Sequence, residues 1–187
     1  DTKLTTNAPT MLDILRFGES QESGTVKQYA TNFTRMFRMR GYKDRHLEAF
    51  EGTLETYLQI APKYRKGDAA LNARILGWEI LPGTYRQYQA DGRRLVETFS
   101  GDLQARRARR ETQDGFAQLQ AVLPDLVSAG LVKDKQTRNL PKLVDLARAR
   151  GWDIADLSRD RIISLREDCL CSDTWGRAKQ GAAFLDY

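Results

Sequence analysis

Helical periodicity is the feature that most constrains the fold of this chain. Between residues 25 and 40, apolar side chains recur at steps of three and four, at Val26, Tyr29, Phe33, Met36 and Phe37. A similar spacing recurs in 84–99. Such spacing places the apolar side chains on one face of an α-helix. No segment alternates in the manner of a β-strand, so we expect an all-α fold of one or more helical bundles.

Glycine and proline residues divide the pattern into separate helices. The expected helices cover 10–17, 25–40, 46–61, 68–80, 84–99, 103–122, 124–130, 138–150, 158–168 and 173–187. Thr25 precedes Gln28, and Thr84 precedes Gln87, with the spacing of a capping box. In a capping box the threonine hydroxyl accepts a hydrogen bond from an early backbone N–H of the helix. We therefore expect one helix to begin at each threonine.

Length and hydropathy exclude several classes of protein. The chain has 187 residues, of which 41% are hydrophobic, enough to supply a packed core. No segment approaches the run of about 18 apolar residues that crosses a bilayer. The N-terminus also lacks the layout of a signal peptide. We therefore expect a soluble, cytoplasmic protein that does not contact a membrane.

Residues that commonly perform catalysis are scarce. His46 is the sole histidine, so any histidine-dependent triad or general acid would have to use it. Cys169 and Cys171 are the two cysteines, and their one-residue spacer does not suit zinc. No nucleophile–base pair, metal cluster or phosphate-binding loop is evident. The sequence therefore predicts no catalytic residue, no metal site, no cofactor and no enzyme activity in this chain.

Positive charge is concentrated in two segments. Six basic residues oppose one acidic residue in 24–45, and seven oppose three in 84–110. The net charge of the whole chain is only +5, because the remainder is slightly acidic. Charge segregated in this way favours basic surfaces that bind a polyanion, although arginine-rich helices also occur on ordinary soluble proteins.

The same two segments share a sequence pattern. Residues 25–37 align without gaps with 84–96, through Thr-x-(Lys/Arg)-Gln-Tyr, then Asn or Asp, then Arg. A weaker version begins at Thr174. Two amphipathic helices can converge on such a pattern by chance. Its coincidence with the excess charge favours a duplicated helical unit or a common task.

Three motifs together resemble the core-binding, SAM-like domain of tyrosine recombinases, the phage-integrase family. The helix from Thr84 to Phe99, with Tyr88 and Asp91-x-x-Arg94, is similar to the first helix of that domain. The segment from Gly151 to Ser158 is similar to the entry to its penultimate helix, and 172–187 to the helix that leads into the catalytic domain. The resemblance implies a core-binding domain at 84–187. It reaches 1–80 only through the Thr25 helix, and it implies there a second SAM-like or arm-type DNA-binding unit.

Members of this family close their helical domain over DNA opposite a catalytic domain. The resemblance therefore implies sequence-directed binding of duplex DNA for site-specific recombination, self-association on DNA, and a location on the nucleoid. The catalytic Arg, His-x-x-Arg and Tyr boxes of the family are missing from this chain, and Tyr187 lacks the boxes that would precede a nucleophile. The recombinase chemistry would belong to a catalytic domain beyond Tyr187.

The residues implied to contact DNA are cationic or polar and lie near both ends of the matching region. They are Thr84, Arg86, Arg93, Arg94, Thr174, Arg177, Lys179 and Gln180. The charged segments add Lys27, Arg35, Arg38, Arg106 and Arg110. Arg86 and Arg93 are seven residues apart and share a helical face, whereas Tyr85, Tyr88 and Leu95 are expected to face the core.

Two other functions remain open. The first is a helical protein-interaction module, whose acidic and basic faces bind partner helices without nucleic-acid chemistry. An acidic stripe at Glu48, Glu51 and Glu55 offers one such face. The second is a helical RNA-binding domain, which competition between duplex DNA and RNA would separate from a DNA-binding one.

Overall fold

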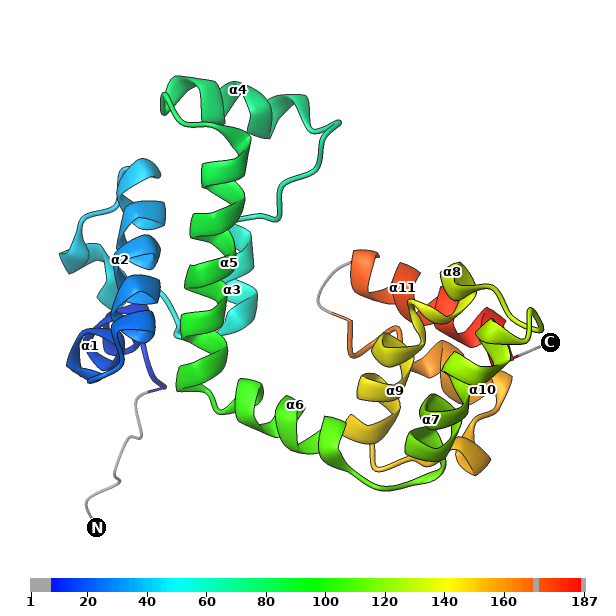
Figure 1. The fold of residues 1–187 in the computed structure, drawn as a ribbon. Helices are drawn as coiled ribbons and strands as arrows, with labels where there is room; N and C mark the ends of the chain where they lie inside the picture. Colours follow the sequence, from blue (N-terminus) through cyan, green and yellow to red (C-terminus); the bar gives the residue numbers. More distant parts are fainter. Residues whose placement is uncertain (1–7, 170–171, 186–187) are drawn as a thin grey trace, which may run out of the picture. The chain divides into compact units, whose positions relative to one another are not determined.

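The computed structural model describes residues 8–169 and 172–185, and every regular element within these ranges is a helix (Figure 1). The only extended pairing in this part of the chain is one isolated antiparallel bridge between Thr10 and Glu51. The all-α prediction is therefore confirmed. None of the described helices is long and apolar enough to cross a membrane. Cys171 and Tyr187 lie outside the described residues.

The chain divides into two compact units, and the boundary along the sequence lies between Gln104 and Ala105. The first unit contains α1 (Met11–Ser20), α2 (Gly24–Met39), the 3-10 helix η1 (Asp44–Ala49), α3 (Leu54–Ile60), α4 (Ala69–Gly77) and α5 (Pro82–Phe99). The boundary differs from the expected division into 1–80 and 84–187. The physical reason is that α5 packs along α2, which places the helix beginning near residue 84 in the first unit (Figure 1).

Aromatic and aliphatic side chains from all parts of the first unit form its core. Phe33 and Phe37 of α2 pack with ring centroids 4.7 Å apart, and Tyr57 of α3 stacks on Phe33 at 5.6 Å. Tyr85 and Leu95 of α5 are fully buried, as the sequence predicted. These apolar contacts, worth about 1.5–3 kcal/mol for each buried large side chain, hold α2, α3 and α5 together.

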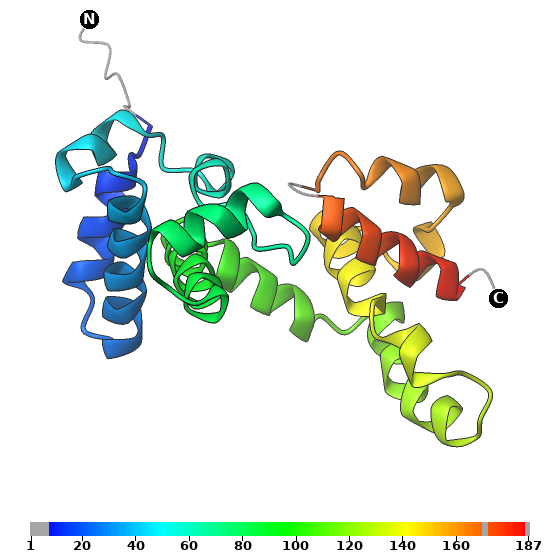
Figure 2. The ribbon, with the colours of Figure 1, turned by 90° about the horizontal axis from the view of Figure 1, so that it is seen from above.

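The second unit has a smaller core. It contains most of α6 (Asp102–Glu111), and α7 (Gly115–Ser128), α8 (Asp134–Thr137), α9 (Leu140–Ala149), the 3-10 helix η2 (Ile154–Asp156), α10 (Arg159–Ser164) and α11 (Ser172–Leu185). α11 lies against α9 (Figure 2). Ala178 and Ala182 of α11 are buried at this contact with Leu140 and Leu143 of α9. Small side chains on one helix allow the two backbones to approach closely.

An ion pair connects the start of α7 to α9. The Arg148 guanidinium donates from Nε and Nη2 to both carboxylate oxygens of Asp114, at 2.7 and 2.5 Å, and only 5% of the Arg148 side chain is exposed. Asp114 also caps α7, because its Oδ1 accepts from the Ala117 N–H at 2.9 Å. These hydrogen bonds hold the pKa of Asp114 below its usual value, and the Arg148 side chain is the largest cause.

Both helices of the repeated pattern begin earlier than the sequence suggested. The first hydrogen bond of α2 runs from the Lys27 N–H to the Ser23 carbonyl, and that of α5 from Tyr85 to Leu81. Neither helix has a side-chain cap. The capping boxes predicted at Thr25 and Thr84 are therefore wrong. At α5 the reason is Pro82, whose fixed φ suits the first position of a helix.

Two expected helices are interrupted by long-range contacts. The segment 46–61 is broken where the Gly52 N–H donates to the Pro9 carbonyl at 2.6 Å, so η1 and α3 are separate. The break expected before Pro124 lies instead at 112–114, where Asp114 meets Arg148. Pro124 itself continues within α7.

Candidate nucleic-acid interface

The two helices that share the sequence pattern pair with each other in antiparallel orientation. Tyr29 of α2 lies under Arg94 of α5, with 5.9 Å between the guanidinium carbon and the ring centroid. In the mirrored contact Arg35 of α2 lies over Tyr88 of α5 at 5.3 Å and donates to the Tyr88 hydroxyl at 3.2 Å. Each tyrosine of the pattern thus contacts the arginine of the other copy. The repeat is explained by a self-complementary pair of helices.

A buried carboxylate lies at the centre of this pairing. Asp91, which is 2% exposed, accepts hydrogen bonds from Asn32 and Gln87, both at 2.8 Å, and from Arg94 at 3.4 Å. Asn32 and Asp91 occupy equivalent positions of the repeated pattern. Burying a charge requires such compensation. Arg35 and Arg94, both expected to bind DNA, therefore hold α2 and α5 together, although each keeps an exposed side.

Two of the other expected DNA contacts in the first unit also have ion-pair partners within the protein. Arg38 pairs with Asp44 at 3.2 Å, and the Nε of Arg93 lies 3.9 Å from the buried carboxylate of Glu97. Thr84 is half-buried. The Lys27 side chain is exposed and has no hydrogen-bond or ion-pair partner among the described residues.

The arginine cluster of α6 has two different faces. Arg106 and Arg109 approach the Asp145 carboxylate of α9 at 3.7 and 3.2 Å, so they anchor α6 to α9. Arg107 and Arg110 are exposed and have no acidic partner in the described part of the chain. Of the two residues expected to bind DNA here, Arg106 has a structural contact and Arg110 is free.

α11 presents two free cations. Arg177 and Lys179 are exposed and unpaired among the described residues. The side-chain Oε1 of Gln180 accepts from the Asn139 side-chain amide at 2.6 Å, which holds the Gln180 side chain against the start of α9. Thr174 is half-buried.

Cations that the charge sums did not reveal lie in the segments that contact the N-terminal half of α5. We call this set the basic corner, and its cations are Arg40, Lys63, Arg65, Lys66, Arg74 and Arg86. Asp68 and Glu79 are the acidic residues of the same segments, and the Asp68 carboxylate caps α4 by accepting from the Leu71 N–H at 2.9 Å.

Aromatic rings position the cations of the basic corner. Arg86 lies over the Tyr64 ring at 5.5 Å, and Arg40 over the Trp78 ring at 6.0 Å. Trp78 in turn stacks on Tyr85 at 6.1 Å. The Tyr85 hydroxyl donates to the Pro62 carbonyl at 2.6 Å, which ties the loop between α3 and α4 to α5.

Burial raises the pKa of Tyr85 to about 12, so its hydroxyl remains a neutral donor. The charges of Arg40, Asp68 and Arg74 also act on this pKa. Arg40 lies over Trp78, whose N–H donates to the carbonyl of Arg74 one turn earlier, so both arginines lie near the C-terminus of α4 although 34 positions separate them in the chain.

Only Arg86 of the basic corner was among the residues expected to bind DNA. The run Lys63-Tyr64-Arg65-Lys66 was an available signal. It was missed because the charge of residues 46–83 sums to −1, so the acidic stripe at Glu48, Glu51 and Glu55 cancelled it.

The chemistry of the corner is that of anion binding. Guanidinium and ammonium groups donate to phosphate oxygens, and aromatic planes beneath the guanidinium groups fix their orientation. No cluster of three or more metal-binding side chains occurs among residues 8–169 and 172–185. Comparison of the chain with models of protein families, with curated proteins and with solved structures finds no match.

Proposed function

We propose that this chain binds duplex DNA, with the basic corner on the phosphate backbone. The observation that carries the proposal is that Arg40 and Arg86 lie over the rings of Trp78 and Tyr64, where α4 and the α3–α4 loop contact α5. Arg40, Arg74 and Arg86 have no carboxylate partner among the described residues. Cations left unpaired at one surface are available to release counterions from DNA, which supplies most of the affinity for a polyanion.

The finer proposal is that the chain is the DNA-gripping part of an integrase-type tyrosine recombinase. The order of the motifs at Thr84, Gly151 and Ser172 supports it. Arg177 and Lys179 of α11 then provide a second phosphate contact, and self-association on DNA and a separate catalytic domain belong to the same proposal. The coding sequence downstream of Tyr187 tests it: the Arg, His-x-x-Arg and Tyr boxes are expected there, and an uninterrupted frame without them contradicts it.

DNA binding itself is tested by fluorescence anisotropy with a labelled duplex over a range of salt concentrations. Arg86→Ala and Lys66→Ala each remove one phosphate contact, so each lowers the slope of log affinity against log salt by about 0.9. The matched control is Arg16→Ala. It removes an equal charge from an exposed position on α1 that is not part of the basic corner.

The proposal is contradicted by salt-insensitive or undetectable binding at low ionic strength. It is equally contradicted if Arg16→Ala lowers the slope as much as Arg86→Ala, because the binding would then depend on total charge alone. Unlabelled duplex RNA is the competitor that distinguishes an RNA-binding domain. RNA is expected to displace the labelled DNA only at a large excess.

A further inference from the structure

α7 is an apolar helix that the rest of the second unit covers incompletely. Phe116 is the one buried residue of α7, and Leu119 and Leu123 pack partly against the core. Val122 is 47% exposed. A helix with apolar residues on most of its circumference is normally covered on most sides. The exposed part of α7 is therefore a surface on which another element can pack.

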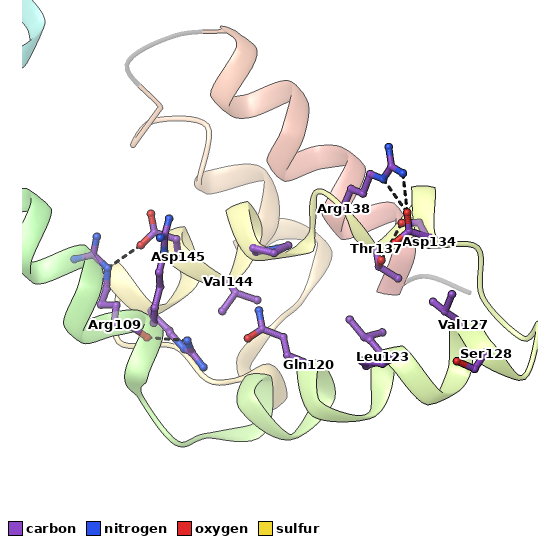
Figure 3. Close-up of a pocket in the computed structure, with 14 residues that line it drawn as sticks. Arg109, Gln120, Leu123, Val127, Ser128, Asp134, Thr137, Arg138, Val144 and Asp145 are labelled. Atoms are coloured by element: carbon purple, nitrogen blue, oxygen red, sulfur yellow. Dashed lines mark hydrogen bonds and ion pairs between the residues drawn. The ribbon is translucent and has the colours of Figure 1, made fainter. Parts of the chain in front are cut away.

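One face of α7 lines a groove of about 790 Å³ that α6, α8 and α9 complete (Figure 3). The lining residues of α7 are Gln120, Leu123, Pro124, Val127 and Ser128. Those of α9 are Pro141, Val144, Asp145 and Arg148. Figure 3 shows Leu123 and Val127 on the α7 side facing the chain segment that carries Val144.

The spacing of these residues indicates which kind of structure fits the groove. On both helices the lining positions recur at three- and four-residue steps, so each helix contributes one continuous stripe. The stripe on α7 spans eight residue steps, or about 12 Å. Two helix faces of this length with an apolar floor suit a third helix, which packs at an interaxial distance of about 8–10 Å.

The charged residues that line the groove indicate which charges a bound helix carries, and at which of its ends. Arg109, Arg110 and Arg148 line the end formed by α6 and α9, where Asp145 is the one acidic lining residue. At the other end Arg138 donates to Asp134 at 2.7 Å, so the charges there balance. Figure 3 shows the Arg138 guanidinium directed at Asp134. Net positive charge is therefore confined to one end, where Arg110 has no acidic partner among the described residues.

We propose that the groove between α7 and α9 binds an amphipathic helix of a partner protein, with its apolar stripe on Leu123, Val127 and Pro141 and acidic residues at one end facing Arg110. Apolar anchors at helical spacing supply the affinity, and the end charge fixes the direction of the helix. The site lies in the second unit and does not use the basic corner, so it is independent of DNA binding.

The test uses two labelled peptides of about four helical turns with one shared apolar stripe of leucines at i, i+3, i+4 and i+7. One peptide carries glutamates in its last turn, and the other carries lysines there. Binding to the full chain is measured by fluorescence anisotropy. The acidic peptide is expected to bind about tenfold more tightly than the basic one.

Two pairs of substitutions locate the binding. Val127→Glu in the groove is expected to weaken binding of the acidic peptide by about tenfold or more, whereas Val122→Glu on the outer face of α7 changes it by less than about threefold. Arg110→Glu and its neighbour Arg107→Glu form the second pair, because Arg107 does not line the groove. Both arginines are exposed, so this pair tests the proposal even if a substitution on α7 impairs folding.

Three results would overturn the proposal. The first is that neither peptide binds, or that both bind equally. The second is that the members of each pair of variants have equal effects, because the peptide would then lie elsewhere. The third is that dodecanoate binds in a manner sensitive to Arg110→Glu while neither peptide does, which would assign the groove to a small amphipathic anion.

Discussion

Glu79 has a left-handed backbone conformation, and it is the one residue other than glycine with a positive φ, 55°, in the described part of the chain. It follows the C-terminus of α4, where its N–H donates to the Leu76 carbonyl at 2.9 Å and the Ile80 N–H donates to the Ile75 carbonyl. These two bonds form a Schellman motif, in which glycine normally occupies the left-handed position. The side chain at Glu79 therefore strains the corner between α4 and α5.

Replacing Glu79 by glycine is expected to stabilise the first unit by about 1 kcal/mol, because left-handed backbone costs about that much for a residue with a Cβ. Chemical denaturation measures the change. Glu79→Ala is the control, since it removes the carboxylate but keeps the Cβ and should give no such gain. An equal gain from both variants would attribute the effect to charge rather than to the backbone.

At the scale of elements, the contact between α7 and α9 depends on one ionised carboxylate. The pKa of Asp114 is lowered in the folded protein, chiefly by its hydrogen bonds from Arg148. A carboxylate with a lowered folded-state pKa stabilises the protein above its unfolded-state pKa. That stability is lost as the pH falls through the lower, folded-state value. The Asp114–Arg148 pair therefore strengthens α7–α9 packing at neutral pH and weakens in acid.

Asp114→Asn tests this dependence on pH. Asparagine still caps a helix, so the variant mainly removes the charge opposite Arg148. We expect a loss of about 3 kcal/mol at neutral pH, as for other broken buried pairs, and a smaller loss below about pH 4. Urea denaturation of both proteins across this range measures the difference.

Asp134→Asn is the matched control. It breaks the exposed Asp134–Arg138 pair, in which both side chains are more than 60% exposed, and should cost less than about 1 kcal/mol. A loss for Asp114→Asn that stays constant from neutral to acid pH would contradict the role given to its charge.

Contacts between elements also explain the repeated sequence pattern. Tyr29, Asn32 and Arg35 of α2 meet Arg94, Asp91 and Tyr88 of α5 in antiparallel order. Because the tyrosine of each copy contacts the arginine of the other copy, and Asn32 contacts the equivalent Asp91, the two copies of the pattern form one interface. The shared task inferred from the repeat is therefore pairing of the two helices, and DNA binding is assigned to neighbouring cations such as Arg86.

At the scale of the whole molecule, each unit buries its own core, so the two units are expected to unfold separately. Gly92→Ala tests this, because a Cβ at Gly92 would clash with the buried ring and hydroxyl of Tyr57. We expect a loss of about 1–3 kcal/mol from overpacking. Scanning calorimetry should show the transition of the first unit at a lower temperature and the second transition unchanged.

Gly83→Ala, on the same helix, is the control for this experiment. A Cβ at Gly83 meets no atom within 4 Å, so the substitution should leave both transitions in place or raise the first slightly. If Gly92→Ala shifts both transitions together, the two units unfold as one cooperative body and the prediction fails.

Local sequence was sufficient for the helical class and for much of the core. The recurrence of apolar residues at three- and four-residue steps depends only on near neighbours, so it correctly placed Tyr85 and Leu95 inside. Helix ends were less predictable. The start of α7 depends on Arg148, which lies 34 positions beyond Asp114 and has no signature near the cap.

The candidate site was predictable only in part for a similar reason. A count of arginines cannot distinguish Arg106, which contacts Asp145, from Arg110, which has no acidic partner in the part of the chain that the structure describes. Summing charge along the chain also separated the loop at Lys63–Lys66 from Arg86, which lies over Tyr64.

The sequence alone therefore determined that this protein is helical, which faces of its helices are apolar, and that positive charge is segregated along the chain. Only the tertiary structure decided that α5 belongs with α2, that the units divide at Gln104, and which cations remain available to a partner. The physical reason is the separation along the chain of the residues that interact. Helical periodicity arises from contacts within one turn, whereas helix pairing and the neutralisation of charge depend on residues far apart in the chain.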